Sequence, residues 1–339
     1  MIDLTVIVPA YNEAECIGYT IESIQKQTLH PKEIIVVDDF SNDGTGDIAR
    51  SYGVTVIRPP ANTGSKAGAQ NFALKEVKTK LVMVTDADTT LAPDAVKQLV
   101  PAFREPSVAA ACGFVIPKKV TTVWERGRYI EYLFSFSFYK QIQDFYGNPL
   151  ISSGCLSMYR TPYLLEAGGW SNRTMAEDMD LTWSLYLLGY RIRFIPTAIC
   201  YPIEPDTLSL MHKQLKRWSA AYLQNVRLHF RAISKLPFLF TAMAVSLTDA
   251  LLSALIYLIG IPLLILLVSP WFGLGYILDA PVILIPTLVI AARRHEIKQA
   301  LTSFPSLFVL RIFNGFIFLK AVLFEVVLRQ HLITYEKGH

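Results

Sequence analysis

The apolar residues of this chain are concentrated in its last third. Residues 236–339 are dominated by long apolar runs, whereas residues 1–235 have the mixed composition of a water-soluble domain. The run at 238–268 contains a single charge, Asp249, and exceeds the roughly 20 residues that a helix needs to cross a bilayer core. The chain is 52% hydrophobic, and we expect a soluble domain followed by a membrane region whose first helix kinks near Pro262.

Two further apolar runs follow. The second, 271–292, precedes the basic stretch 293–298, which the positive-inside rule assigns to a cytosolic loop. The third, 304–328, carries three charges. We expect it either to cross the membrane or to lie at its surface, and the basic tail after it slightly favours the cytosolic side. Asp249 and Asp279 either face protein or the headgroup layer, or line a polar path for a sugar.

Charge and cysteine content restrict the partners and the compartment. The net charge is only +4, and the basic residues cluster at 212–235 and 293–298, beside the apolar runs. This placement suits anionic membrane lipids, and no aromatic and basic stripe indicates nucleic acid. The four cysteines lie far apart without CxxC spacing, which favours reduced thiols over disulfides or structural zinc. The opening MIDLTVIVP is typical of a strand rather than a signal peptide, so we expect a multi-pass protein of the cell membrane with a cytoplasmic catalytic domain.

The first 115 residues alternate short β-branched runs with segments of helical composition. The apolar runs are 4–9, 33–38, 54–58, 80–86 and 108–115, and the helical segments lie near 13–27, 44–52, 65–78 and 94–104. Strands this continuous in Val and Ile are usually buried on both faces, as in a parallel sheet wound with helices. We therefore expect an α/β fold, and sheets of this kind bind ligands beyond the carboxyl ends of their strands.

Charged and glycine-rich segments follow the first four of these strands. They are PAYNE (9–13), DDFSNDG (38–44), NTGSKAGAQN (62–71) and TDADTT (85–90). Asp86 and Asp88 suit a hard divalent cation that carries a phosphate, and Lys66, between two glycines, suits a phosphate that the backbone approaches closely. Each segment alone is more simply a turn or a helix start. All four at one sheet edge predict a binding site, because buried strand ends rarely collect charge without a partner.

The stretch HKQLKRW, residues 212–218, lies shortly before the first apolar run. On a helix, Gln214, Arg217 and Trp218 share one face, while the intervening lysines point elsewhere. A binding surface and an amphipathic helix at the membrane interface both fit this pattern. Residues 122–146 are similarly aromatic and basic, and we expect them to form a second helix on the membrane surface.

Several of these segments match known motifs in order and spacing: VIVPAYNE, VVDDFSNDGT, TDAD, AED and QLKRW. Over about residues 1–230 the sequence resembles the family 2 glycosyltransferases, which are inverting enzymes of the GT-A fold. Its Gln-x-x-Arg-Trp motif is similar to that of the membrane synthases of cellulose, chitin, hyaluronan and poly-N-acetylglucosamine. The stretches 152–161 and 177–196 look most like the last of these.

The resemblance also implies roles for individual residues. On the donor side it implies Pro9, Ala10, Tyr11 and Glu13 around the nucleoside, Asp39 on the uracil, and Lys66 and Arg217 on the diphosphate. Asp86 and Asp88 would hold the ribose edge and an Mg²⁺ or Mn²⁺ ion that bridges the diphosphate. The acceptor would meet Gly154, Cys155, Glu177, Gln214 and Trp218. Asp178 would be the general base that removes a proton from the acceptor hydroxyl, with its neighbour Glu177 as the alternative base.

The expected activity is therefore that of a metal-dependent membrane hexosyltransferase. It would move a sugar from UDP-N-acetylglucosamine or UDP-glucose to a growing polysaccharide, or alternatively add one or a few sugars to a membrane lipid. An inactive scaffold fits the intact acidic residues poorly. We expect a GT-A domain at 1–235, with interfacial helices near 122–146 and 208–231, and membrane helices near 238–268, 271–292 and 304–328. So few membrane helices favour self-association or an accessory subunit if the product is a secreted polymer.

Overall fold

The computed structural model describes residues 1–332. Within them the chain forms two compact units, one made of residues 1–118 and 141–203, the other of residues 119–140 and the chain from 204 onward. The two segments that we expected at the membrane interface fall largely in the second unit. They group with the apolar helices and not with the sheet.

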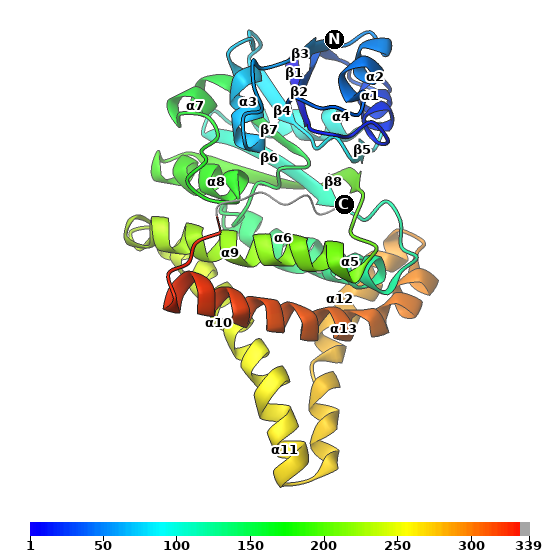
Figure 1. Ribbon diagram of the computed structural model, residues 1–339, viewed down its shortest axis with the longest axis vertical. Helices are drawn as coiled ribbons and strands as arrows, with labels where there is room; N and C mark the ends of the chain where they lie inside the picture. The colour runs from blue at the N-terminus through cyan, green and yellow to red at the C-terminus, as the bar shows by residue number, and fades with distance from the viewer. Residues whose placement is uncertain (333–339) are drawn as a thin grey trace. The chain divides into compact units, whose positions relative to one another are not determined.

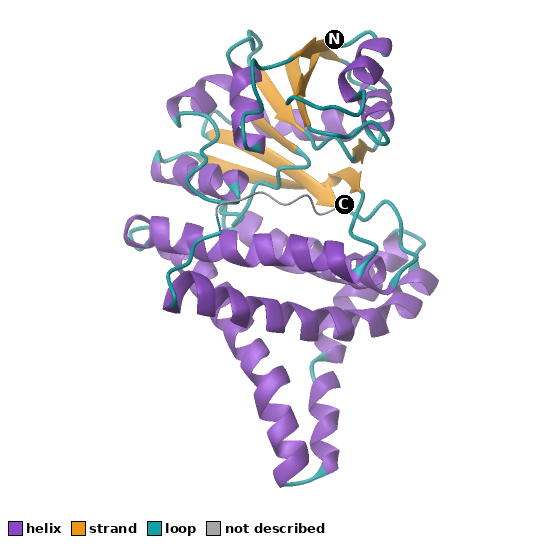
Figure 2. Ribbon diagram, viewed as in Figure 1, coloured by secondary structure: helices purple, strands orange, loops and turns teal. Residues whose placement is uncertain are grey.

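The first unit is built on a mixed eight-stranded sheet with the strand order β3-β2-β1-β4-β7-β6-β8-β5 (Figure 2). Its strands are β1 (Ile2–Ala10), β2 (Pro31–Asp38), β3 (Thr55–Ile57), β4 (Leu81–Val84), β5 (Thr89–Leu91), β6 (Val108–Val115), β7 (Ser157–Arg160) and β8 (Arg191–Pro202). The strands β3, β2, β1 and β4 run parallel, as the sequence predicts. In the other half β7 is antiparallel to both β4 and β6, and β5 is antiparallel to β8. Strands β6 and β8 pair parallel to each other. The α/β class is confirmed, and the two reversed strands, β7 and β5, are a feature that the sequence pattern does not predict.

The parallel strands form the core of this unit. Val6 and Ile7 of β1 point to opposite faces of the sheet, and neither has any exposed surface. Helices therefore cover both faces, which explains the unbroken apolar sequence of these strands. The helices are α1 (Ile17–Gln25), α2 (Thr45–Ser51), α3 (Lys66–Leu74), α4 (Ala95–Leu99) with the 3₁₀ turn η1 (Val100–Arg104), α7 (Thr161–Glu166) and α8 (Glu177–Leu187) (Figure 1).

The second unit is helical in all its described regular structure (Figure 2). It contains α5 (Val123–Phe134), the π-helix η2 (Ser135–Tyr139) and α9 (Leu208–Ile233). The helix α6 (Lys140–Phe145) follows η2, and from residue 141 it belongs to the first unit. The apolar region comprises α10 (Pro237–Leu255), η3 (Ile256–Gly260), α11 (Ile261–Leu267), η4 (Pro270–Ile277), α12 (Ala280–Arg293), α13 (Ile297–Ala321) and η5 (Val322–Val327). Three helical stretches among the described residues are long and apolar enough to cross a membrane, namely Pro237–Leu267, Pro270–Arg293 and Ile297–Val327.

Helix α13 is the centre of packing in this unit. It contacts α5, α9, α10 and α12, and in Figure 1 it runs alongside α9 and across the hairpin of α10, α11 and α12. Leu310 of α13 packs with Leu215 of α9 in one apolar cluster. Gly127 permits the close approach of α5, because a Cβ there would lie 3.0 Å from Leu310. The helix that we expected either to span the membrane or to lie on it thus packs along the two amphipathic helices.

Candidate active site

The first predicted site segments meet at the carboxyl ends of β1 and β2. Ala10 pairs with Asp38 across the two strands, and its carbonyl oxygen accepts the Asp39 N–H at 2.8 Å. Pro9 and Ala10 end β1, and the loop that follows exposes Tyr11, which is 49% accessible. The N–H of Glu13 donates to Thr45 Oγ1 at 2.8 Å.

Asp38 and Asp39 are adjacent in sequence but have different surroundings. The Asp38 carboxylate accepts hydrogen bonds from Ser41 N–H at 2.9 Å and from Arg58 Nη1 at 3.1 Å, and it is fully enclosed. Asp39 accepts bonds from the N–H and the hydroxyl of Thr63, both at 2.8 Å. Asn62 donates to the Asp39 carbonyl at 2.7 Å. The loop after β3 therefore fixes the second aspartate, while the first stabilises its own turn.

Lys66 stands at the start of α3 and points into a cluster of carboxylates. Ser65 caps the helix by accepting the Gly68 N–H at 3.0 Å, so Lys66 is the first helical residue. Its ammonium forms an ion pair with Asp86, which follows β4, and lies 3.5 Å from Glu177 Oε1. Burial alone would lower the pKa of Lys66, but the three surrounding carboxylates outweigh it and hold the pKa well above its ordinary value. The lysine therefore carries a positive charge into the site.

Asp178 lies in the first turn of α8 and is oriented by backbone donors. Its Oδ2 accepts the Gly154 N–H at 2.9 Å, and its Oδ1 accepts the Met179 N–H at 2.8 Å. A carboxylate in the first turn is also favoured by the helix dipole. A Cβ at Gly154 would lie 2.9 Å from Lys66 Nζ and 3.2 Å from Asp178 Oδ2. The glycine thus lets the loop before β7 pass between the lysine and the carboxylate.

Glu177 directly precedes Asp178, and only 13% of its side chain is exposed. Burial raises the pKa of Glu177, the neighbouring Lys66 opposes this rise, and Asp178 adds to it. Glu177 therefore holds its proton more tightly than an ordinary glutamate. Both candidates for the general base are present in one cluster, and only Asp178 has both oxygens held by the backbone.

The loop before β7 also carries Cys155. The Thr85 hydroxyl at the end of β4 donates to the Cys155 carbonyl at 2.9 Å, which fixes the loop to the strand that leads to Asp86. Cys155 is a free thiol whose Sγ lies 3.7 Å from that of the buried Cys200. The Cys155 backbone therefore belongs to the frame of the site.

The two aspartates predicted to bind metal supply a limited ligand set. Asp86 pairs with Lys66, and Asp88 Oδ1 accepts the Thr89 hydroxyl at 3.1 Å. No group of three or more His, Cys, Asp or Glu side chains arranged to hold a metal ion occurs within residues 1–332. Mg²⁺ is commonly bound by one or two carboxylates together with substrate phosphates. These residues fit a divalent ion that shares its coordination with a diphosphate.

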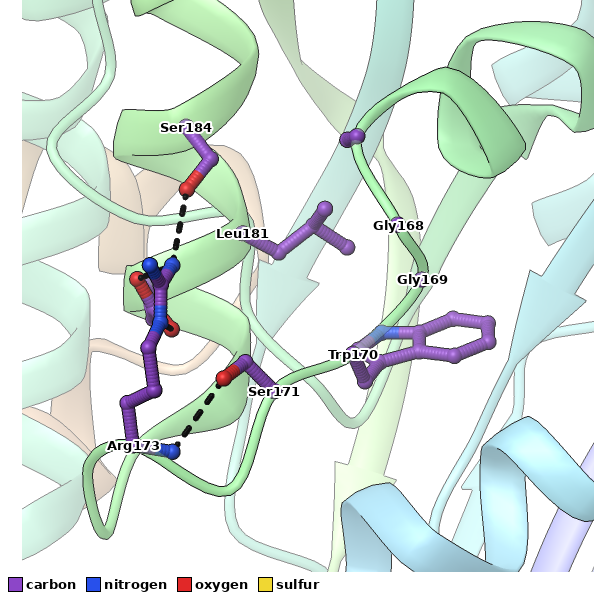
Figure 3. Close-up of a pocket in the computed structure, with 9 residues that line it drawn as sticks. Gly168, Gly169, Trp170, Ser171, Arg173, Leu181 and Ser184 are labelled. Carbon is purple, nitrogen blue, oxygen red and sulfur yellow. Dashed lines mark hydrogen bonds and ion pairs between the residues drawn. The ribbon is translucent and has the colours of Figure 1, made fainter.

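The loop that leads into α8 carries a set of contacts that the sequence did not predict. Arg173 donates to both oxygens of Asp180, at 3.1 and 2.8 Å, and Nη2 reaches the Ser184 hydroxyl at 3.4 Å (Figure 3). Asn71 exchanges two hydrogen bonds with the backbone of Trp170. These contacts border a cavity of about 330 Å³ and tie the loop to α3 and α8. Its only sequence signal is the acidic spacing of residues 177–180.

The residues predicted on the helix before the apolar region lie on α9, in the second unit. Gln214 and Trp218 occupy one face, where both contact Arg128 of α5. Arg217 lies beside them and is half-buried. The sequence reasoning singled out the motif and overlooked Arg128, whose only signal was its position in the aromatic and basic segment 122–146.

Comparison with known proteins shows what this chain is similar to. Residues 5–166 match the family described as Glycosyl transferase family 2. Over 221 residues the chain is 29% identical to the poly-beta-1,6-N-acetyl-D-glucosamine synthase of Staphylococcus aureus (strain COL), a match that covers 64% of this chain and 53% of that protein. The synthase of the same name from Staphylococcus epidermidis is 28% identical, with the same coverage. The chain thus spans about half the length of the curated relatives that it matches.

A solved structure shares the fold over nearly the whole chain. The mannosyltransferase PcManGT from Pyrobaculum calidifontis, in complex with GDP-Man and Mn²⁺, superposes with a TM-score of 0.62. The match covers 97% of this chain and 88% of that structure, at 22% sequence identity. The likeness includes the helices that follow the sheet.

Proposed function

We propose that this chain is a membrane-bound inverting hexosyltransferase. The proposal starts from the match of residues 5–166 to the glycosyl transferase family 2 model. It transfers N-acetylglucosamine, or else glucose, from the UDP-sugar to the hydroxyl of a growing polysaccharide. One observation carries the proposal: Lys66, Asp86, Gly154 and Asp178 converge at one edge of the sheet. The similarity to synthases of a β-1,6-linked N-acetylglucosamine polymer supports the choice of sugar.

Asp178 acts as the general base. The acceptor hydroxyl attacks the anomeric carbon from the face opposite the diphosphate, so the configuration inverts. The bond from the anomeric carbon to the diphosphate oxygen breaks, its electron pair leaves with the diphosphate, and the hydroxyl proton passes to Asp178. The two backbone N–H groups on this carboxylate support that role, because they fix its direction before the substrate arrives.

Lys66 and Asp86 serve the diphosphate. The protonated Lys66 neutralises charge on the leaving group and exchanges part of its contact with Asp86 for phosphate oxygens. Asp86 and Asp88 would hold a divalent ion, which would supply further neutralisation of the diphosphate. Asp39 and Tyr11 hold the nucleoside. The nucleoside site also includes Pro9 and Ala10, which end β1, and Glu13 in the loop that follows.

Two side chains of the α9 motif have a proposed role in the reaction. By the resemblance to polysaccharide synthases, Arg217 contacts the diphosphate and Trp218 stacks on the acceptor sugar, whose C–H face suits an indole. Gly154, Cys155 and Glu177 border the acceptor. The stretches Pro237–Leu267 and Pro270–Arg293 form a membrane hairpin, with the catalytic unit in the cytoplasm.

The deciding experiment identifies donor and product together. Purified protein in lipid with Mn²⁺ receives radiolabelled UDP-N-acetylglucosamine, UDP-glucose or GDP-mannose in separate reactions, and the products are sized by gel and by organic extraction. Label from UDP-N-acetylglucosamine in high-mass material that resists extraction supports a polymer synthase. A single labelled lipid would overturn the polymer and favour a glycolipid-forming transferase. Label from GDP-mannose alone would overturn the choice of nucleotide.

A further inference from the structure

Arg128 of α5 is enclosed almost completely, although arginine is among the residue types least often buried. Only 2% of it is exposed. Its neighbours on the same helix explain the direction of the side chain. The capping box formed by Thr122 and Glu125 fixes the start of α5, and the helix then presents Arg128 and Tyr132 on one face, at i and i+4.

The guanidinium reaches side chains from three places in the second unit. Nη1 donates to Glu131 Oε2 at 2.5 Å, Nη2 donates to Gln214 Oε1 at 2.8 Å, and Nε lies 3.8 Å from Glu204 Oε2. Its planar face lies over Trp218, with 4.5 Å between the guanidinium carbon and the ring centroid. One arginine thus contacts both the glutamine and the tryptophan of the α9 motif.

Gln214 is engaged at both ends of its amide. Its oxygen accepts from Arg128, and its nitrogen donates to Glu204 Oε2 at 3.3 Å. Glu204 in turn accepts the Tyr132 hydroxyl at 2.9 Å on its other oxygen. These contacts assign the amide orientation from the hydrogen-bond network. Gln214 therefore connects α9 to this network and does not present a free amide to a sugar.

Trp218 is stacked by Arg128 and remains partly exposed. Arg128 covers one face of the indole, yet 38% of Trp218 stays exposed. Stacking between a cation and an indole fixes the plane of the ring, so the exposed surface keeps a defined direction. A sugar that stacks on the exposed part of the indole binds a ring whose orientation is already fixed. Less conformational entropy is therefore lost on binding.

The charge arrangement also favours an orienting role over a purely stabilising one. Burial would lower the pKa of Arg128, but Glu131 and Glu204 hold it above its ordinary value, so the side chain is charged. Buried ion pairs of this kind are often no more stabilising than apolar side chains of the same volume. The arrangement orients the side chains of Gln214 and Trp218, because only a planar guanidinium can hydrogen-bond Gln214 while it stacks on Trp218.

We infer that Arg128 is a positioning residue for acceptor binding, which orients Trp218 directly and fixes α9 through Gln214. This inference rests on the proposed function and deepens it. It changes the role of Gln214 from an acceptor ligand to a link between Arg128 and Glu204. It also gives the motif two separate roles: Trp218, which Arg128 orients, and Arg217, for which the resemblance implies contact with the donor.

The test compares Arg128→Lys with Arg126→Lys. Lysine keeps the charge that Glu131 and Glu204 require but cannot reproduce the fork and the stacking, whereas Arg126 is exposed on the same helix. With UDP-N-acetylglucosamine, Mn²⁺ and host membranes as the source of acceptor, sugar incorporated and UDP released are both measured. Arg128→Lys is expected to reduce incorporation per UDP released by about 10- to 100-fold, while the donor KM stays within about threefold and Arg126→Lys behaves like the parent.

Trp218→Ala separates the inference from the proposed function. The double variant Arg128→Lys, Trp218→Ala is expected to incorporate as much sugar per UDP released as Trp218→Ala alone. Both substitutions remove the same interaction, the stacking of Arg128 on Trp218. If Trp218→Ala lowers incorporation and Arg128→Lys does not, the inference is wrong and the proposed function stands. If Arg128→Lys both weakens UDP binding and lowers the melting temperature, Arg128 has only a structural role and the inference is wrong. A parent protein that transfers no sugar overturns the proposed function and the inference together.

Discussion

The backbone N–H of Gly154 donates a hydrogen bond of 2.9 Å to Oδ2 of Asp178, which is 24 residues further along the chain. The contact joins the loop before β7 to the first turn of α8. It fixes the carboxylate that we propose as the general base, and it leaves no space for a side chain at position 154.

Gly154→Ala is expected to lower kcat/KM for the UDP-sugar by about 10- to 100-fold, because a displacement of about 1 Å is enough for such a loss. The added methyl group would lie 2.9 Å from Lys66 Nζ and push that flexible end away from Asp86. The melting temperature should change little. In a Lys66→Ala background the same substitution should cost far less, and an equal cost there would contradict the displacement of Lys66.

Asp178→Asn is expected to lower kcat by a factor of about 10² to 10⁴, the usual contribution of a general base. The amide keeps the shape of the side chain but cannot accept the proton. UDP binding, measured by calorimetry, should be unchanged, and Asp47→Asn at an exposed position should keep full activity. Substantial activity in Asp178→Asn together with its loss in Glu177→Gln would transfer the role of base to Glu177.

Glu177 should make the stability of the protein depend on pH. Its pKa in the folded state is raised by burial, so the folded protein binds this proton more tightly than the unfolded chain does. The free energy of unfolding therefore falls as the pH rises from the unfolded value, about 4.3, through the folded pKa. Above that range Glu177 is ionised in both states, and its buried charge lowers the free energy of unfolding by the full amount.

Glu177→Gln removes this cost, since Lys66 keeps Asp86 as a partner. We expect the variant to melt at a higher temperature than the parent at pH 8, by about 2–4 °C per kcal/mol, and the difference to shrink as the pH falls toward 5. The exposed Glu76→Gln serves as the control and should show no such trend. A difference that grows on acidification would contradict the raised pKa.

Both ends of α13 are expected on the cytoplasmic side. The helix runs along α9 and across the apolar hairpin, so a bilayer spanned by the hairpin would have α13 near its surface. Leu301→Cys and Val327→Cys should react with an impermeant maleimide only after the cells are permeabilised, whereas Trp271→Cys at the hairpin turn should react in intact cells. Labelling of Val327→Cys in intact cells would instead indicate a third crossing.

Much of the candidate site could be predicted because it follows parallel strands. The segments after β1, β2 and β4 must emerge at one edge, since parallel strands end on the same side of a sheet. Helical spacing also predicted that Gln214 and Trp218 share one face of α9. In contrast, Gly154 comes next to Lys66 only because β7 pairs antiparallel with β4, and this pairing has no signature in the alternation of strands and helices.

Arg128 shows the same limit in the second unit. In the sequence it is one cation in an aromatic and basic segment, which a surface helix explains equally well. Its burial depends on α9, 86 residues away, bringing Gln214 to its guanidinium. A charge pattern on one helix cannot reveal a partner on another.

The sequence by itself determined the local features: the parallel half of the sheet, the polar segments at its edge, and helices apolar enough to enter a membrane. Each depends on periodicity and composition over a few neighbouring residues. Tertiary structure alone decided that Asp39 and not Asp38 is held by Thr63, that Gly154 orients Asp178, and that Gln214 serves Arg128. These contacts join distant segments, and their geometry is set by packing of the whole unit, which no local pattern encodes.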